Sequence, residues 1–222
     1  MTADAGAGGP PGGPLRDLLF ADLPPGRARE VFARGGDATR FLVDLAVAAE
    51  AGDAPAALRA VVGAPSPHRE TRLFLQACCL ARAAGVDLGA GSSEPLGVVV
   101  DLHTDDGLDT LAGFADGSAR YLSYSGAGVV WEVPDQDIGR LVGALLDRAV
   151  AVVEMTGPLE GPRPGPPGHG GAMVSVLTPG GIHVGAGSVY ALSNDSRGGP
   201  VIAAASELLA VLVGRATRAD AR

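Results

Sequence analysis

The spacing of apolar residues divides the chain into two parts with different periodicity. From residue 15 to about residue 88, apolar residues recur every three or four positions, which is typical of amphipathic helices. From residue 96 onward, short apolar runs separated by turn residues indicate strands. The pattern predicts a helical domain at 15–88 and an α+β domain at 96–217, joined by a linker at 89–95.

The second part of the chain is predicted to contain most of its strands before its helices. Asp116-Gly117 is a strong hairpin signal, because glycine supplies the positive φ of a type I′ turn. Asp135 is placed to cap a long amphipathic helix, and Gly199-Pro200 to begin a last one. Six strands are expected at 96–102, 108–114, 120–124, 129–133, 173–178 and 182–192.

The predicted fold class is α+β, with a small N-terminal helical bundle followed by an antiparallel sheet with two packed helices. The expected order of elements in the second part is ββββαββα. This order resembles that of the broad profilin-like group, which includes roadblock-type regulators and sensor domains of the GAF and PAS kinds. The resemblance rests on element order alone and implies no particular activity, because a fold does not determine a function.

Glycine and proline mark the segments that are expected to lack regular structure. Proline has no backbone N–H, and glycine loses the most conformational entropy on ordering. The two residues dominate the first fourteen positions and the stretch 157–171. We therefore expect a disordered leader at 1–14, an irregular insert at 157–171 and a disordered tail at 218–222.

The charge and the cysteine content restrict the class of protein. The formal net charge is −8, and all 17 cationic side chains are arginine, so lysine chemistry is excluded. No basic stripe, secretion signal or run of 18 apolar residues occurs, so we expect no binding to nucleic acid or membranes. Two adjacent cysteines, Cys78 and Cys79, fit a reducing cytoplasm, and the composition is typical of a GC-rich bacterial genome.

One acidic stretch has the residue types of a metal site. Asp101, His103 and Asp105 would share one face of a strand, and two carboxylates with an imidazole bind divalent metals. The strand is expected to end near His103, which makes Asp105-Asp106-Gly107 more simply a turn. A metal-dependent hydrolase built on this stretch is therefore only the second alternative, and no metal or cofactor is expected.

The remaining candidates for chemistry lie in the last predicted hairpin. His183 would need a serine such as Ser175 or Ser188, but the chain has no Gly-x-Ser-x-Gly elbow. No residue is therefore predicted to be catalytic. The glycine-rich stretch 185–187 would leave room for a small molecule between the sheet and a helix, and a small-molecule-sensing module is the first alternative.

The best candidate for a functional surface is a group of aromatic and charged residues. Arg120, Tyr124 and Trp131 are of the types that anchor interfaces, and they are also types that pack well across strands in a sheet. Asp105 and Asp106 belong either to an acidic surface that would attract a basic partner or simply to exposed acidic turns. The sequence favours a non-enzymatic, cytoplasmic bacterial protein with a regulatory or adaptor role. It would act through protein–protein contacts of its α+β domain, with another protein or with a second copy in a dimer.

Overall fold

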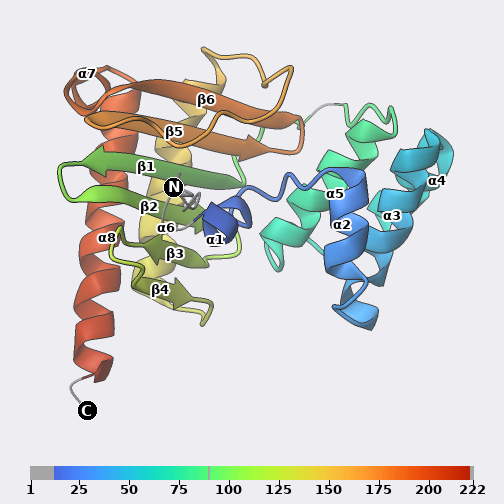
Figure 1. Cartoon of the computed structure of the whole chain (residues 1–222), viewed down its shortest axis with the longest axis horizontal. Coiled ribbons are helices and arrows are strands. Elements are labelled where there is room, and N and C mark those ends of the chain that lie inside the picture. The colour runs from blue at the N-terminus through green and yellow to red at the C-terminus, as the bar shows by residue number, and fades with distance from the viewer. Residues whose placement is uncertain (1–12, 90, 221–222) are drawn as a thin grey trace, which may run out of the picture.

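The computed structural model describes residues 13–89 and 91–220, and in them it shows an α+β protein built on a six-stranded antiparallel sheet (Figure 1). The helices are α1 (Gly13–Asp17), α2 (Pro25–Phe32), the 3-10 turn η1 (Asp37–Thr39), α3 (Arg40–Ala51), α4 (Ala54–Val62), α5 (Thr71–Ala83), α6 (Gln136–Val153), α7 (Val189–Asn194) and α8 (Gly198–Asp220). The strands are β1 (Gly97–Thr104), β2 (Gly107–Phe114), β3 (Ala119–Leu122), β4 (Gly128–Trp131), β5 (Gly171–Thr178) and β6 (Gly181–Ser188).

The strands lie in the order β4-β3-β2-β1-β5-β6, and every neighbouring pair is antiparallel. This confirms the α+β class and the antiparallel sheet. The predicted turn at Asp116-Gly117 joins β2 to β3, and Gly117 has the expected positive φ of 81°. The turn is longer than the two residues expected, because the N–H of Phe114 donates to the carbonyl oxygen of Ser118 and leaves residues 115–117 between them. Ser118 also donates to the Asp116 carboxylate from both its backbone N–H and its hydroxyl.

One face of the sheet is covered by α6 and α8, which lie side by side behind the strands in Figure 1. Asp135 caps α6 as predicted, since its carboxylate accepts the backbone N–H groups of Asp137 and Ile138, each at 3.0 Å. The amphipathic pattern of both helices turns their apolar residues towards the strands. The main core includes Val98, Val100, Leu111, Ile138, Val142, Leu145, Val174, Val176, Leu208 and Leu212.

The last helix has an apolar composition that its packing explains in part. The segment Gly198–Thr217 is long and apolar enough to cross a membrane by length and composition, with a mean hydropathy of 1.5, although it is not an unbroken apolar run. Val201, Leu208 and Leu212 of this segment are buried against the sheet. In this structure α8 packs on the sheet along one side, with 28% of the apolar window buried.

Helices α2 to α5 pack on one another beside the sheet, around an apolar cluster of their own (Figure 1). Alanine is frequent in this cluster and lets the helices approach closely. Cys78 of α5 is buried, as free cysteines usually are, and burial raises the pKa of its thiol to about 12. The fully buried members of the cluster are Ala28, Leu42, Leu45, Ala46, Ala57, Ala77, Leu80 and Ala81.

The second strand of the last hairpin is shorter than predicted. We expected a strand at 182–192, but β6 ends at Ser188 and α7 begins at Val189. Ser188 has an extended backbone, and its hydroxyl accepts the N–H of Ala191 at 3.1 Å, so it is the N-cap of α7. The prediction was wrong because this cap outweighs the strand preference of Val189 and Tyr190.

Residues 15–21, called the strap from here on, lie on the other face of the sheet, in front of the strands in Figure 1. Leu19, Phe20 and Ala21 of the strap are buried in a third apolar cluster. One other member, Leu75, comes from α5, and the rest come from the sheet and the residue before it: Leu96, Val99, Ala112, Phe114 and Leu177. The strap therefore packs on the sheet and on one side of α5.

The domain boundaries remain a prediction. The structure shows where several of the segments near these boundaries lie. The strap begins the predicted helical domain, 15–88, yet contacts the sheet. The insert 157–171 contains no helix or strand before β5 begins at Gly171. Residues 1–12 of the predicted leader lie outside the described residues, and α8 extends to Asp220 within the predicted tail.

Candidate functional site

The face of the sheet that carries the strap has a group of polar side chains in its interior. Residues that pair across antiparallel strands point to the same side of a sheet. The registers of β1 with β2 and β5, and of β2 with β3, therefore place Asp101, Thr110, Arg120 and Ser175 on this face. All four residues are buried. Buried polar groups need partners, and charged residues are rarely buried without one, so this face is the first candidate site.

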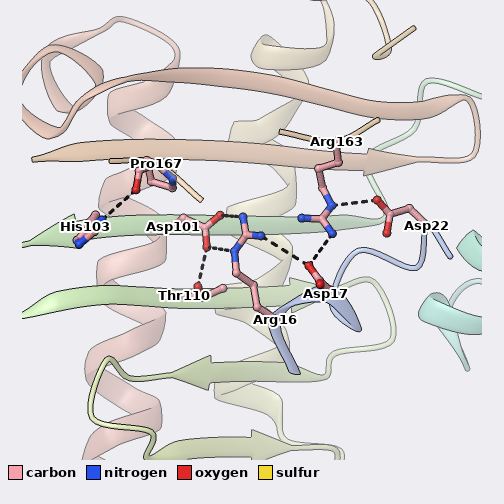
Figure 2. Close-up of polar contacts among 8 residues, drawn as sticks. All are labelled: Arg16, Asp17, Asp22, Asp101, His103, Thr110, Arg163 and Pro167. Carbon is pink, nitrogen blue, oxygen red and sulfur yellow. Dashed lines mark hydrogen bonds and ion pairs between the residues drawn. The ribbon is translucent and has the colours of Figure 1, made fainter. Parts of the chain in front are cut away.

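Arg16 of the strap and Asp101 of β1 form a buried ion pair (Figure 2). Nε of Arg16 donates to Oδ1 of Asp101 at 2.9 Å, and Nη2 donates to Oδ2 at 2.5 Å. The Thr110 hydroxyl donates to the same Oδ1 at 2.6 Å. The Asp101 side chain is fully buried and that of Arg16 is 4% exposed. This two-pronged contact is the strongest polar attachment of the strap to the sheet.

A second arginine, Arg163, joins the strap to the loop between α6 and β5 (Figure 2). Its Nε donates to Asp22 and its Nη2 to Asp17, both at 2.9 Å. Its guanidinium carbon lies 3.6 Å from the centroid of the Phe20 ring, and the guanidinium carbon of Arg16 lies 4.9 Å from the same centroid. Two cations thus contact one buried ring, and the strap and the loop cover the sheet together.

The same loop is also bound to the end of β1. Nδ1 of His103 lies 2.9 Å from the carbonyl oxygen of Pro167 (Figure 2). The N–H of Gly170 donates to the carbonyl oxygen of His103 at 2.7 Å. His169 of the loop lies 2.9 Å from the exposed Asp105 carboxylate. These contacts fix the end of the loop that is farthest from Arg163.

The residues of the metal hypothesis are therefore held apart. Asp101 is bound to Arg16, His103 is bound to the loop, and Asp105 lies in the exposed β1–β2 turn. Among residues 13–89 and 91–220, no group of three or more His, Cys, Asp or Glu side chains is placed to hold a metal ion.

A cleft of about 440 Å³ opens between the strap, α2, α5 and the β2–β3 end of the sheet. Its volume lies in the range of small-ligand pockets, about 300–1,000 Å³. Its apolar wall consists of Leu18, Ala21, Leu23, Val31, Phe32 and Leu73. Its charged lining consists of Arg69, Arg72, Arg120, Asp17, Glu70, Asp116 and Glu132.

Within the cleft, Arg72 and Arg120 converge on one carboxylate. Nη2 of Arg120 is ion-paired with Oε1 of Glu132, and Nη2 of Arg72 lies 3.4 Å from the same oxygen. Burial lowers the pKa of Arg120, the neighbouring charge of Arg72 lowers it further, and Glu132 opposes both effects. The Glu132 side chain is 61% exposed, so two guanidinium groups share one carboxylate that faces solvent. The two guanidinium groups thus lie at an exposed edge of a cleft that also carries the acids Asp17, Glu70 and Asp116.

The predicted partner-binding residues do not form one surface. Arg120 lines the cleft, but Trp131 lies half-buried on the opposite face of the sheet, against the core of α6 and α8. Arg120 pairs with Val130, so the next residue along β4 points to the other side. The guanidinium carbon of Arg215 lies 5.6 Å from the Trp131 ring centroid.

Tyr124, Asp105 and Asp106 lie together at the far end of the sheet. The N–H of Tyr124 donates to the Asp109 carboxylate at 3.0 Å, which ties the β3–β4 turn to β2. A Cβ on Gly107 would lie 2.7 Å from that of Tyr124, so the two turns are in close contact. All three predicted residues are exposed and form a surface separate from the cleft.

The last predicted hairpin does not assemble a histidine–serine pair. His183 is buried with its Nδ1 2.8 Å from the carbonyl oxygen of Thr156, and Ser188 is used as a helix cap. Ser175 lies on the opposite face of the sheet from His183, and its buried hydroxyl has no hydrogen-bond partner in the described part of the chain. The glycine-rich stretch 185–187 does not line the cleft.

Sequence reasoning missed Arg16, Arg72 and Arg163. A signal was present for Arg16, because Asp101 is a lone acid within an apolar strand and a buried carboxylate needs a partner. No comparable signal marks the other two, because Arg72 lies in an amphipathic helix and Arg163 in the glycine- and proline-rich insert, where an exposed arginine is ordinary.

Comparison with known proteins adds no match. No protein-family model matches the chain, and no curated protein and no solved structure is significantly similar to it. The function is therefore argued from the geometry of the cleft and of the strap.

Proposed function

We propose that this protein is a non-enzymatic regulatory or adaptor protein that binds a partner protein in the cleft. The observation that carries the proposal is the convergence of Arg72 and Arg120 on the exposed Glu132, beside an apolar wall. Arginine next to a desolvated apolar surface is the usual composition of interface hot spots. The complementary partner is a segment that carries a carboxylate next to apolar side chains.

The polar residues on the sheet support a binding role over a chemical one. The Asp101 carboxylate is engaged by Arg16 and Thr110, and the imidazole of His183 lies at hydrogen-bond distance from Thr156. A general base or nucleophile has to reach a substrate with a free lone pair or a labile proton. Groups that are engaged with one another in this way are instead available to hold segments of the chain in place.

The finer architecture is part of the same proposal. We infer that α2 to α5 form an N-terminal bundle and that the second part has a profilin-like or roadblock-like arrangement. The succession of β1 to β4, α6, β5, β6 and α8 supports this inference, with α7 as an additional short helix. A bacterial cytoplasm as the location, and a dimer as one form of the assembly, belong to this proposal.

The proposal is tested by affinity purification with two charge-reversal variants. Arg72→Glu removes one of the paired guanidinium groups, while Arg59→Glu makes the same charge change on the exposed surface of α4. We expect a partner that is retained by the wild type and by Arg59→Glu but lost with Arg72→Glu. Light scattering after gel filtration identifies the case in which the partner is a second copy. Equal retention by Arg72→Glu, or substrate turnover by the purified protein, contradicts the proposal.

A small-molecule-sensing role is the second candidate, favoured by the cleft volume of about 440 Å³. A ligand that binds only the folded state raises the melting temperature as its concentration rises. We expect a carboxylate-bearing metabolite to stabilise the wild type and not Arg72→Glu. A panel of such compounds that leaves the melting temperature of the wild type unchanged removes this candidate.

A further inference from the structure

We propose that the strap occupies, within its own chain, a binding site for an arginine-bearing segment, and that a segment of the same chemistry from a partner protein displaces it. The partner segment carries an arginine and, four residues later, an aromatic side chain. This inference goes beyond the proposed function, because it concerns the sheet face beneath the strap, although Asp17, Leu18 and Ala21 of the strap also line the cleft. The observations that carry it are the contacts of Arg16 and Phe20 and the polar residues beneath them.

The floor of this site is built to recognise a guanidinium group. Asp101 is fully buried, and its two oxygens accept from Nε and Nη2 of Arg16 in a fork. Thr110 donates to one of these oxygens and so fixes the carboxylate plane. A lysine ammonium is a point charge and cannot reproduce this two-pronged contact, so the floor selects arginine over lysine.

The second recognition element is a place for an aromatic ring. Phe20 is 1% exposed and lies in contact distance of the guanidinium groups of Arg16 and Arg163. Phe20 lies three residues beyond the end of α1, and the chain turns there through bonds from the N–H of Leu19 to the carbonyl oxygen of Arg16 and from the N–H of Phe20 to that of Asp17. This turn lets Arg16 and Phe20 both reach the sheet. Arg163 belongs to the loop, and its hydrogen bonds go to Asp17 of the strap and to the adjacent Asp22. Displacement of the strap therefore makes its guanidinium group available to a ring from another chain.

The strap is attached in a way that permits its release. Its helix α1 has only five residues, which is too short to be stable without the contacts beneath it. Gln76 of α5 holds the chain at Leu23, accepting from its N–H at 3.0 Å and donating to its carbonyl oxygen at 2.9 Å. When the strap leaves the sheet it also leaves Leu75 of α5, while Gln76 keeps the chain attached to α5 at Leu23.

The strap also leaves one group of the site unused. Ser175 is fully buried on the same face as Asp101, and its hydroxyl has no hydrogen-bond partner among the described residues. A buried hydroxyl without a partner is unfavourable, and a segment that supplies an acceptor or donor to Ser175 gains a contact that the strap does not make. Once uncovered, the polar groups of the floor are also easily hydrated.

The test uses a labelled synthetic peptide with the sequence of residues 13–24 and the full chain. In the wild type, the strap competes with the peptide for the same site. In the Arg16→Ala chain, this competition is weakened, so we expect fluorescence polarisation to show binding about tenfold tighter or better. A peptide with alanine in place of the arginine should lose about tenfold or more in affinity for that chain. Arg27→Ala, which alters an exposed arginine of α2, should bind as the wild type does.

Hydrogen exchange on the unaltered chain covers the case in which Arg16→Ala does not fold. We expect the amides of the strap to exchange faster than those of β1, and an excess of the peptide, but not of its arginine-to-alanine form, to accelerate their exchange further. The proposal is overturned if the strap exchanges as slowly as β1 and the two peptides act alike. Peptide binding should be unaffected by Arg72→Glu, so this inference and the proposed function fail separately.

Discussion

The two faces of the sheet are covered in different ways, although both covers are buried. On one face, α6 and α8 cover the strands with apolar side chains over 18 and 23 residues of helix. On the other, the strap and the loop are attached through the buried arginines Arg16 and Arg163 and the carboxylates they bind. The strap also buries Leu19, Phe20 and Ala21 in an apolar cluster, so its release exposes apolar surface, but its charged groups regain hydration when they separate. The two covers thus differ in the polar share of their attachment, and on this difference rests the proposal that the strap is the one that can be displaced.

The largest loss of stability is expected from a substitution that creates a cavity between α6 and the sheet. Leu145 is fully buried between α6 and the sheet, and Leu145→Ala removes its contacts without a replacement. We expect a loss of about 2–5 kcal/mol in the free energy of unfolding. Urea unfolding followed by circular dichroism and by the fluorescence of Trp131 should give one coincident transition. Val150→Ala on the exposed side of the same helix should change little, and a split transition would show that this face is not a single unit.

A smaller loss of stability is expected from a substitution on the face of the sheet that carries the strap. Asp101→Asn removes the carboxylate that binds Arg16, and a buried pair with no access to water would lose about 3–5 kcal/mol. Because the strap can leave the sheet and hydrate Arg16, we expect a smaller loss than for Leu145→Ala, together with faster hydrogen exchange of residues 15–21. Asp105→Asn, in an exposed turn, is the control. A loss as large as that of Leu145→Ala with unchanged strap exchange would make the two faces equivalent.

The sequence predicted the face of the sheet covered by α6 and α8 better than the face covered by the strap, for a physical reason. The pattern of Ile138, Leu141, Val142 and Leu145 is repeated within one helix, and Asp135 caps that helix three residues before Ile138. Such local signals survive in any tertiary context. The partner of Asp101 lies 85 positions away, and no local pattern identifies it.

The predicted surface residues show the same limit. Arg120, Tyr124 and Trp131 were grouped because their residue types suit interfaces and they are close in sequence. Their positions along β3 and β4 place Arg120 and Trp131 on opposite faces of the sheet, and Tyr124 lies in a turn at the far end. The cleft that Arg120 lines also needs α2, α5 and the strap, and no sequence pattern predicted that these would meet there.

A modest loss of stability is expected from a substitution at the solvent-exposed edge of the cleft. Glu132→Gln removes the carboxylate that Arg72 and Arg120 share. Because Glu132 is largely exposed, we expect a loss of only about 0.2–1 kcal/mol at low ionic strength, which salt should reduce. The variant should be stabilised by added sulfate more than the wild type is, since its guanidinium pair lacks an anion. Glu207→Gln on the exposed surface of α8 should respond to sulfate as the wild type does, and an equal response by all three proteins would contradict a role of this pair in anion binding.

The smallest loss of stability is expected from a change at Asp135, which caps α6 at the edge of the face that α6 and α8 cover. The backbone N–H of Ile138 lowers the pKa of Asp135 most, and Arg215 lowers it further. A carboxyl whose pKa is lower in the folded state contributes stability above its unfolded pKa, about 4, and loses that contribution as the pH falls through the folded value.

Asp135→Asn tests this contribution directly. Asparagine still caps the helix but carries no charge for Arg215 and does not titrate. We expect the variant to be slightly less stable than the wild type at neutral pH, and the difference to shrink as the pH falls below about 4. Urea unfolding of both proteins across this pH range measures it, with Asp147→Asn on the exposed side of α6 as the control. A constant difference at every pH would mean that the charge of Asp135 adds nothing to its capping role. The face that α6 and α8 cover would then depend on apolar contacts and backbone hydrogen bonds alone, which would widen its contrast with the face beneath the strap.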